Sequence, residues 1–85
     1  MAAEIKVTTE SWLDARGIRN MVWQGAKDRV EDLTDEDLET IIGILASEYV
    51  DGIDETELND FLWFEDDLYA EWLGYSNAEE LWENR

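Results

Sequence analysis

The chain of 85 residues carries a formal net charge of −17 at pH 7 and contains five Trp, three Tyr and two Phe but neither Cys nor His. The lack of Cys and His excludes disulfides, thiol nucleophiles, imidazole bases and the usual zinc ligands. The strong negative charge argues against nucleic acid and anionic membranes as partners, because like charges repel, and it favours a basic protein surface.

The charged residues are distributed unevenly along the chain. Residues 1–29 hold five basic and four acidic side chains, whereas residues 30–84 hold nineteen acidic side chains and no Lys or Arg. The length and the absence of a Pro-rich or Ser/Gly-rich linker predict one domain over residues 1–85. The aromatic content predicts that this domain folds, because acidic disordered segments are usually poor in aromatic residues.

The first predicted element is a short strand at Glu4–Thr8, where Ile5 and Val7 alternate with other residues. A single strand has no pairing partner of its own, so it either pairs with a second short segment or remains an extended arm. If its edge stays open, the same segment of another copy can pair with it.

A helix is predicted to begin near Trp12, with Thr9 or Ser11 as its N-cap. Two glycines within residues 11–33 each weaken a helix by roughly 1 kcal/mol relative to Ala, so we expect either one broken helix or two shorter ones. An apolar stripe runs along this region and consists of Ile18, Val22, Ala26, Val30 and Leu33.

Two further helices are predicted on either side of the most acidic part of the chain. Thr34 begins the first, which ends at Asp51–Gly52. Its apolar face consists of Leu38, Ile41, Ile42, Leu45 and Tyr49. The second is a short last helix opened by a capping box at Ser76–Glu79, with Leu81 and Trp82 as its docking residues.

Residues 54–74 form the longest segment that can be one uninterrupted helix. Asp54 is the expected N-cap and Glu57 stands at N3. Gly74 can close the last turn in a left-handed conformation, with Tyr75 folding back against the helix. Together the elements predict a mainly α fold, a compact bundle of about four helices with or without the short N-terminal strand.

This long helix is predicted to have an apolar face and an acidic face. At 3.6 residues per turn, the apolar face consists of Leu58, Phe61, Leu62, Leu68, Tyr69, Trp72 and Leu73. Asp60, Asp67 and Glu71 fall on the opposite face, within about 40° of one another.

Glu65 does not follow this division, because it falls near the centre of the apolar face. An ionised carboxylate is costly there unless it is paired. We expect an internal ion pair with Arg16, Arg19 or Arg29, and the alternative is a site for a partner's cation.

Trp63 and Phe64 are also exceptions, since they point towards the acidic side. Either another element of the bundle covers them, or they are an exposed aromatic pair. An exposed pair with a charged rim of Asp60, Asp67 and Glu71 would be a protein-binding surface.

No motif indicates catalysis, a cofactor or a metal site. Nucleophilic triads need a His or Lys base beside Ser or Cys, and a small helical bundle offers no deep cleft for a glycosidase carboxylate pair. An EF-hand loop starting at Asp51 would need an acid where Ile53 stands and a Gly where Thr56 stands. We therefore expect a protein that is not an enzyme and that takes no cofactor or metal.

The predicted partner-binding residues are Asp54, Glu57, Asp60, Trp63, Phe64, Asp66, Asp67 and Glu71. Duplex DNA carries one charge per about 1.7 Å of its axis. On one helix, Asp60, Asp67 and Glu71 would be spaced by about 10 and about 6 Å. A rigid helix with acids at such intervals can occupy a groove built for phosphates. The alternative, that this face only keeps the protein soluble, stays open.

The stretch ETELNDFLWFEDDLYAEWLGY, with WQGAKD upstream and IKV near the start, resembles a set of small acidic proteins. These are carried by phages, prophages and conjugative elements of Gram-positive bacteria. The likeness covers the chain from about Ile5 to Tyr75 and brings no catalytic or metal motif. It implies a location in the cytoplasm of a bacterial host, and a setting in which small acidic proteins include anti-CRISPR and anti-restriction inhibitors that imitate DNA.

The resulting hypothesis is a DNA-mimicking inhibitor that binds the basic DNA-recognition groove of a Cas9-type or restriction nuclease and competes with DNA. The alternative is a non-catalytic structural or adaptor protein of a mobile element. It would bind through the exposed aromatics Trp63 and Phe64 or self-associate through Ile5–Val7. Neither hypothesis involves a membrane or direct binding of nucleic acid.

Overall fold

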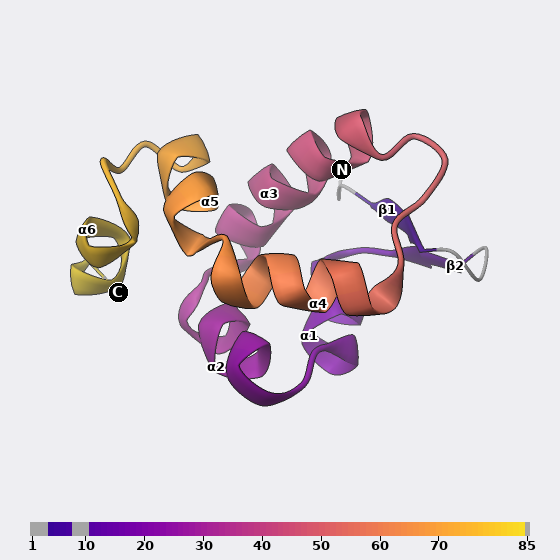
Figure 1. Ribbon diagram of the computed structural model, residues 1–85, viewed down its shortest axis with the longest axis horizontal. Coiled ribbons are helices and arrows are strands. Elements are labelled where there is room, and N and C mark those ends of the chain that lie inside the picture. The colour runs from indigo at the N-terminus through magenta and orange to yellow at the C-terminus, as the bar shows by residue number, and fades with distance from the viewer. Residues whose placement is uncertain (1–3, 8–10, 85) are drawn as a thin grey trace.

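The computed structural model describes residues 4–7 and 11–84, which form a two-stranded sheet and six helices (Figure 1). The elements are β1 (Ile5–Val7), β2 (Ser11–Leu13), α1 (Ala15–Met21), α2 (Gln24–Asp32), α3 (Asp35–Glu48), α4 (Glu55–Phe64), α5 (Asp66–Trp72) and α6 (Ala78–Glu83). The mainly helical class is confirmed. The number of about four helices is wrong, because residues 11–33 and residues 54–74 each contribute two helices to the described chain.

The predicted N-terminal strand is present and has a neighbour on each edge. β1 pairs antiparallel with β2, so that Ile5 lies opposite Leu13. On its other edge Val7 forms a parallel bridge with Ile53, whose N–H donates to the Lys6 carbonyl at 2.9 Å. The bridge occupies the second edge of β1 at Val7, so less of this edge is open to another copy, and self-association through Ile5–Val7 stays a prediction.

The first helix begins later than predicted, because Trp12 belongs to β2. Helix α1 starts at Ala15, and its N-cap is Asp14, whose carboxylate accepts a hydrogen bond from the Gly17 N–H at 2.9 Å. The backbone groups around Trp12 form hydrogen bonds to β1. The strand therefore extends to Leu13, and no helix starts near Trp12. Ser11 is therefore not the N-cap, and Thr9 lies outside the described residues.

Helices α1 and α2 meet at Val22 and Trp23, a break that neither glycine makes. The Trp23 N–H donates to the side-chain oxygen of Asn59 on α4 at 2.9 Å, and Gln24 adopts a left-handed conformation with φ of 53°. The predicted apolar stripe of this region is buried throughout: Ile18, Val22, Ala26, Val30 and Leu33.

Helix α3 follows the prediction at its start and along its apolar face. The Thr34 hydroxyl accepts from the Asp37 N–H at 3.0 Å, and the Asp37 carboxylate accepts from the Thr34 N–H at 3.2 Å. This reciprocal capping satisfies two donors that a helix start leaves unpaired. The predicted face is buried at Leu38, Ile41, Ile42 and Leu45, whereas Tyr49 is only half-buried.

The predicted single helix over residues 54–74 is wrong, because the chain breaks at Glu65 between α4 and α5. The Leu62 carbonyl, which an unbroken helix would bond to the Asp66 N–H, instead accepts from the Tyr69 hydroxyl at 3.0 Å. The break also places Asp66 and Asp67 in the first turn of α5, where the helix dipole favours negative charge. Tertiary contacts thus override the local helical pattern.

Both predicted ends of this segment are nevertheless correct. The Asp54 carboxylate accepts from the Thr56 N–H at 2.8 Å and caps α4. Gly74 has a φ of 96°, and the Tyr75 N–H donates to the Ala70 carbonyl at 2.9 Å. This hydrogen bond and the left-handed Gly74 are features of a Schellman motif, which requires a left-handed residue of the kind that Gly supplies.

Helix α6 lies beside α5 at one end of the molecule, and α4 packs mainly on α2 (Figure 1). The N-cap of α6 is Asn77, whose side chain accepts from the Glu80 N–H at 2.9 Å. The predicted capping box at Ser76–Glu79 is therefore wrong by one residue. The Ala78 N–H, the first of this helix, is bound by the Asp67 carboxylate at 2.8 Å. Leu81 is buried as predicted.

Candidate functional site

The break at Glu65 divides the predicted acidic face between two helices. Asp54 caps α4, and Glu57 and Asp60 lie along it, all three exposed. Asp66, Asp67 and Glu71 belong to α5. Asp60, Asp67 and Glu71 therefore do not share one continuous helical face, and the regular spacing expected for that face is wrong.

Two of the predicted binding residues hold the fold together. The Asp66 carboxylate accepts from the Trp82 indole N–H at 3.0 Å and lies 3.5 Å from an Arg29 guanidinium nitrogen. Arg29 in turn lies over the Trp82 ring, 5.2 Å from its centre. The Asp67 carboxylate binds the first N–H of α6. Both side chains thereby attach α6 to α5, and Asp66 also links α5 to α2.

Trp63 and Phe64 differ in their environment, although the sequence predicted that both would be covered or both would be exposed. Trp63 is half-buried against α2, where a Cβ built on Gly25 would lie only 2.0 Å from the indole nitrogen. Phe64 is 63% exposed and stacks on Trp63, with ring centres 4.6 Å apart and planes inclined by 15°. Trp63 is therefore covered by another helix, and Phe64 is the exposed member of the pair.

Glu65 is exposed at the α4–α5 junction, so the predicted buried ion pair is wrong. The break removes Glu65 from the apolar face on which an unbroken helix would place it. Arg29 pairs with Asp66 and Arg19 pairs with Asp35 at 3.0 Å. Arg19 and Arg29 thus meet acids other than the predicted one.

Arg19 also binds the C-terminal end of α2. Its guanidinium donates to the Val30 carbonyl and, at 2.6 Å, to the Leu33 carbonyl. A cation at this position complements the negative end of the helix dipole. Arg19 and Arg29 are therefore held by contacts within the chain, and each pairs with one carboxylate, the exposed Asp35 and the partly buried Asp66.

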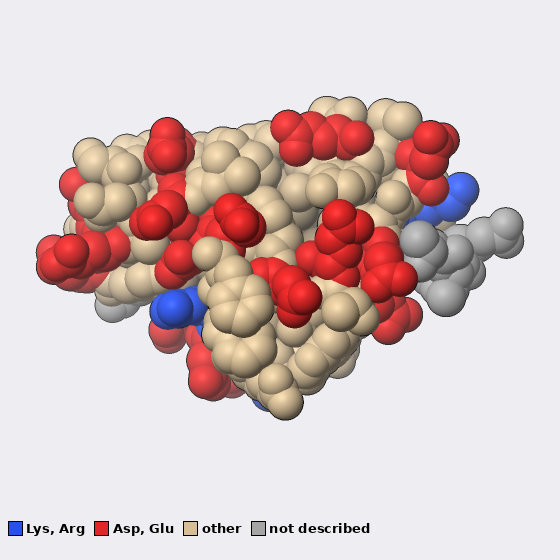
Figure 2. All heavy atoms as spheres, viewed as in Figure 1, with Lys and Arg blue, Asp and Glu red and all other residues tan. Residues whose placement is uncertain are grey.

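Most of the acids remain on the outer surface. All but three of the nineteen acidic side chains in residues 30–84 are exposed, and the three are Asp37, Glu39 and Asp66. Figure 2 shows carboxylates distributed across the whole of one face, with little basic surface between them. The negative surface is a property of several helices together.

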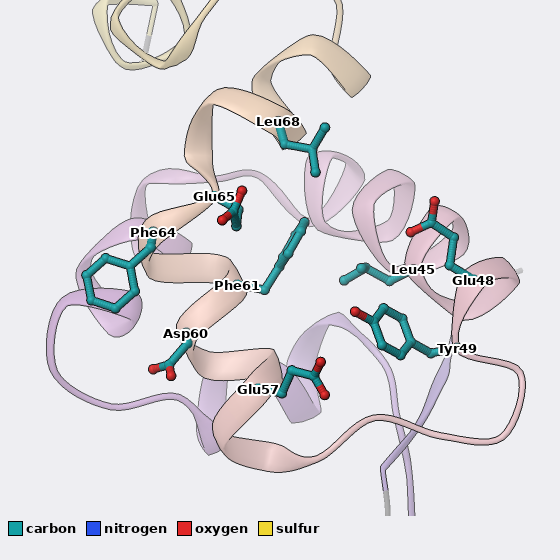
Figure 3. A pocket seen from close by; sticks show the side chains of 9 residues that line it. All are labelled: Leu45, Glu48, Tyr49, Glu57, Asp60, Phe61, Phe64, Glu65 and Leu68. Carbon is teal, nitrogen blue, oxygen red and sulfur yellow. The ribbon is translucent and has the colours of Figure 1, made fainter.

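A pocket of about 400 Å³ lies between α3, α4 and the start of α5 (Figure 3). It is lined by Leu45, Glu48, Tyr49, Glu57, Asp60, Phe61, Phe64, Glu65 and Leu68. The Phe61 ring projects from α4 towards Leu45 and Tyr49 on the side of α3, whereas Phe64 points away from that gap (Figure 3). Three of the predicted binding residues, Glu57, Asp60 and Phe64, thus line one pocket.

The sequence pattern assigned the floor of this pocket to the core instead. The sequence pattern places Phe61 and Leu68 on the apolar face of one long helix, and Leu45 and Tyr49 on the apolar face of the predicted helix before it. In the structure Leu45 is buried, but Phe61 and Tyr49 are half-buried and Leu68 is 40% exposed. The available signal was the position of Tyr49 at the end of its apolar stripe, beside Glu48.

The carboxylates around the pocket affect its tyrosine. The negative charge of Glu57 raises the pKa of Tyr49 above its usual value of 10.0, and burial and the charge of Glu48 raise it further. The phenol is therefore neutral at physiological pH and remains a hydrogen-bond donor.

The described residues contain no group of three or more Asp or Glu side chains arranged to hold a metal ion. No helix among residues 4–7 and 11–84 is long and apolar enough to cross a membrane. No protein-family model, curated protein or solved structure matches the chain. The resemblance to small acidic proteins of mobile elements stays a prediction.

Proposed function

We propose that the protein is a non-catalytic inhibitor that occupies a basic DNA-binding groove of a partner protein and competes there with DNA. The observation that supports this most directly is the exposed acid over α3, α4 and α5, combined with the pairing of Arg19 and Arg29 within the chain. A surface of one sign attracts a surface of the other and excludes like-charged molecules. A net charge of −17 also opposes folding through self-repulsion. Binding to a basic partner would give this charge a function beyond keeping the protein soluble.

The partner in this proposal is a host defence nuclease of the Cas9 or restriction type. Such enzymes hold DNA in positively charged channels, and Cas9-type effectors read a short duplex motif with Arg side chains. The resemblance to small acidic proteins of phages and conjugative elements favours this class, and the proposed encounter takes place in the bacterial cytoplasm. The divided α4–α5 surface would present acid from two rigid helices rather than from one regular row.

The decisive experiment measures competition and salt dependence together. The labelled protein is titrated with guide-loaded Cas9-type nucleases and with restriction nucleases, with and without a cognate DNA duplex, at 50 and 300 mM NaCl. We expect the duplex to displace the protein and the higher salt to weaken binding by more than about tenfold, since several charge pairs are screened. Simultaneous binding of protein and duplex, or an affinity that ignores salt, would contradict the proposal.

A charge-reversal variant tests whether α4 and α5 carry the contact. Replacement of Glu57, Asp60 and Glu71 by Lys changes three exposed acids on these helices. The matched control replaces Glu31, Glu79 and Glu83, which are exposed on α2 and α6 and change the net charge equally. Weaker binding by the first variant than by the control is the expected result. An equal loss of affinity in the two variants would indicate general charge attraction to the nuclease without a defined binding face.

A second candidate function is an adaptor that binds through exposed aromatic side chains. The observation that favours it is Phe64, which is 63% exposed although it stacks on Trp63. An adaptor would lose its partner on Phe64→Ala and keep it after reversal of Glu57, Asp60 and Glu71. The opposite result favours the DNA-competing inhibitor.

A further inference from the structure

The pocket between α3 and α4 combines an aromatic floor with an acidic rim. Phe61 and Tyr49 supply the aromatic side chains, and the acids come from three places: Glu48 on α3, Glu57 and Asp60 on α4, and Glu65 at the junction. Among the described residues no Lys or Arg lines this pocket. Its volume of about 400 Å³ lies at the small end of the range for ligand pockets, about 300 to 1,000 Å³, which suits one side chain better than a large ligand.

The floor is held rigidly from behind. The Phe61 ring stacks on Trp72 with centres 5.5 Å apart and planes inclined by 23°. It also contacts Tyr69, whose ring centre is 6.0 Å away and whose hydroxyl is bound to the Leu62 carbonyl. A floor that is already ordered loses little conformational entropy when a ligand binds.

The chemistry of the lining selects a particular occupant. An apolar side chain would bring no charge to meet the acidic rim, and a small hydrated cation would gain little from the aromatic floor. A planar guanidinium can contact an aromatic ring and donate to carboxylates at the same time, and the stem that carries it is apolar. A lysine ammonium is a more strongly hydrated point charge and fits this combination less well.

We propose that this pocket binds a single arginine side chain of the basic partner, with the guanidinium against Phe61 and Tyr49 and its N–H groups directed to Glu57 and Glu65. The inference rests on the proposed function, since a basic DNA-binding surface is the source of that arginine. It makes Phe61 and Tyr49 partner-binding residues in addition to the exposed acids.

The test uses a blocked pentapeptide, acetyl-Gly-Gly-Arg-Gly-Gly-amide, and two analogues with lysine or neutral citrulline in place of arginine. NMR titration follows the ring signals of Tyr49 and Phe61 together with the backbone amides. We expect saturable shifts of both rings with the arginine peptide and an affinity about fivefold higher than for the lysine peptide. The citrulline peptide should leave the rings unshifted, because it keeps the shape of arginine and lacks its charge.

Paired variants separate the pocket from general charge attraction. Glu57→Gln with Glu65→Gln removes the two rim charges that the proposal assigns to the guanidinium, and Glu79→Gln with Glu83→Gln removes two exposed charges on α6. The rim variant should weaken arginine-peptide binding by about fivefold and the α6 variant by less than about twofold. Both use exposed positions, so neither is expected to disturb folding.

Three outcomes would overturn the assignment: equal effects of the two variants, equal affinity for arginine and citrulline peptides, or shifts confined to residues outside the pocket. The peptide titration contains no nuclease, so its failure leaves the competition with DNA to be judged separately. Conversely, a nuclease that binds protein and DNA together would remove the proposed function while a positive peptide result stands.

Discussion

Gly25 and Trp63 pack so closely that the side chain at position 25 decides the position of the indole. A Cβ there would lie 2.0 Å from the indole nitrogen, whereas a Cβ on Gly43 of α3 would meet nothing within 4 Å. We predict that Gly25→Ala lowers the free energy of unfolding by about 1–3 kcal/mol through overpacking. Gly43→Ala should raise it by up to about 1 kcal/mol, because Ala favours a helix.

Urea denaturation of the two variants provides the comparison. Trp63 must shift in the Gly25→Ala protein, and the stacked Phe64 must shift with it. The ring signals of Phe64 should therefore change in this variant and not in Gly43→Ala. Similar stabilities for both variants would show that the contact with Trp63 is looser than its geometry indicates.

The ionisation of the Tyr69 phenol makes the stability of the protein depend on pH in the alkaline range. Burial and the charge of Asp66 raise the pKa of its phenol far above the usual 10.0, although Arg29 lowers it somewhat. The unfolded chain therefore releases this proton at lower pH than the folded one, and the stabilising contribution is complete below about pH 10. We predict that the free energy of unfolding falls as the pH rises above about 10.

The variant Tyr69→Phe isolates this effect. It removes the hydrogen bond to the Leu62 carbonyl and should destabilise the protein at neutral pH by about 1–3 kcal/mol, because a buried carbonyl loses its partner. Its stability should also fall less steeply between pH 10 and pH 11 than that of the wild type. Identical alkaline slopes, measured by urea titration, would contradict the assignment to Tyr69.

At the scale of elements, α6 depends on two carboxylates of α5. Asp67 accepts from the Ala78 N–H, the first donor of that helix, at 2.8 Å. We predict that Asp67→Ala costs about 1 kcal/mol, the usual value of an N-terminal cap, and lets α6 open locally. Hydrogen exchange should quicken in α6 and stay unchanged in α3.

Glu71→Ala is the matched control for this prediction, since Glu71 lies on the same helix and is exposed. It should alter exchange in neither helix. Faster exchange throughout the protein after Asp67→Ala would indicate that α6 unfolds together with the rest of the chain.

The divided helix also shows what the sequence could and could not predict. The stripe from Ile18 to Leu33 and the face from Leu38 to Leu45 were predicted correctly, because burial follows the local helical period. The break at Glu65 was missed because Asp66 meets Arg29 and Trp82, residues distant in sequence. Glu65, an acid within the apolar face, was the local sign of the break, but it was interpreted as half of a buried ion pair.

The candidate site, like the fold, was predicted only in part. Exposed acids such as Glu57 and Asp60 were predicted from composition and helical phase. The pocket was not, because Tyr49 is the C-cap of α3 and Phe61 lies on α4, so their half-buried state depends on how these two elements are placed in the fold. The break itself moved Glu65 from a predicted core position to the rim.

For the whole molecule, the net charge of −17 predicts opposite effects of salt on folding and on binding. Screening weakens self-repulsion, so the melting temperature should rise between 10 and 500 mM NaCl. The same screening should weaken the attachment to a basic partner. Calorimetry and affinity measurements in one salt series test both signs, and a melting temperature that falls with salt would contradict the first.

The bridge between Val7 and Ile53 joins β1 to the segment just before α4. The chain between these residues contains β2, α1, α2 and α3, so the contact closes a loop that spans more than half of the chain. Closing so large a loop is slow unless the intervening helices have already assembled. We therefore expect this bridge to form late in folding: Val7→Ala should speed unfolding while leaving the refolding rate nearly unchanged in stopped-flow measurements.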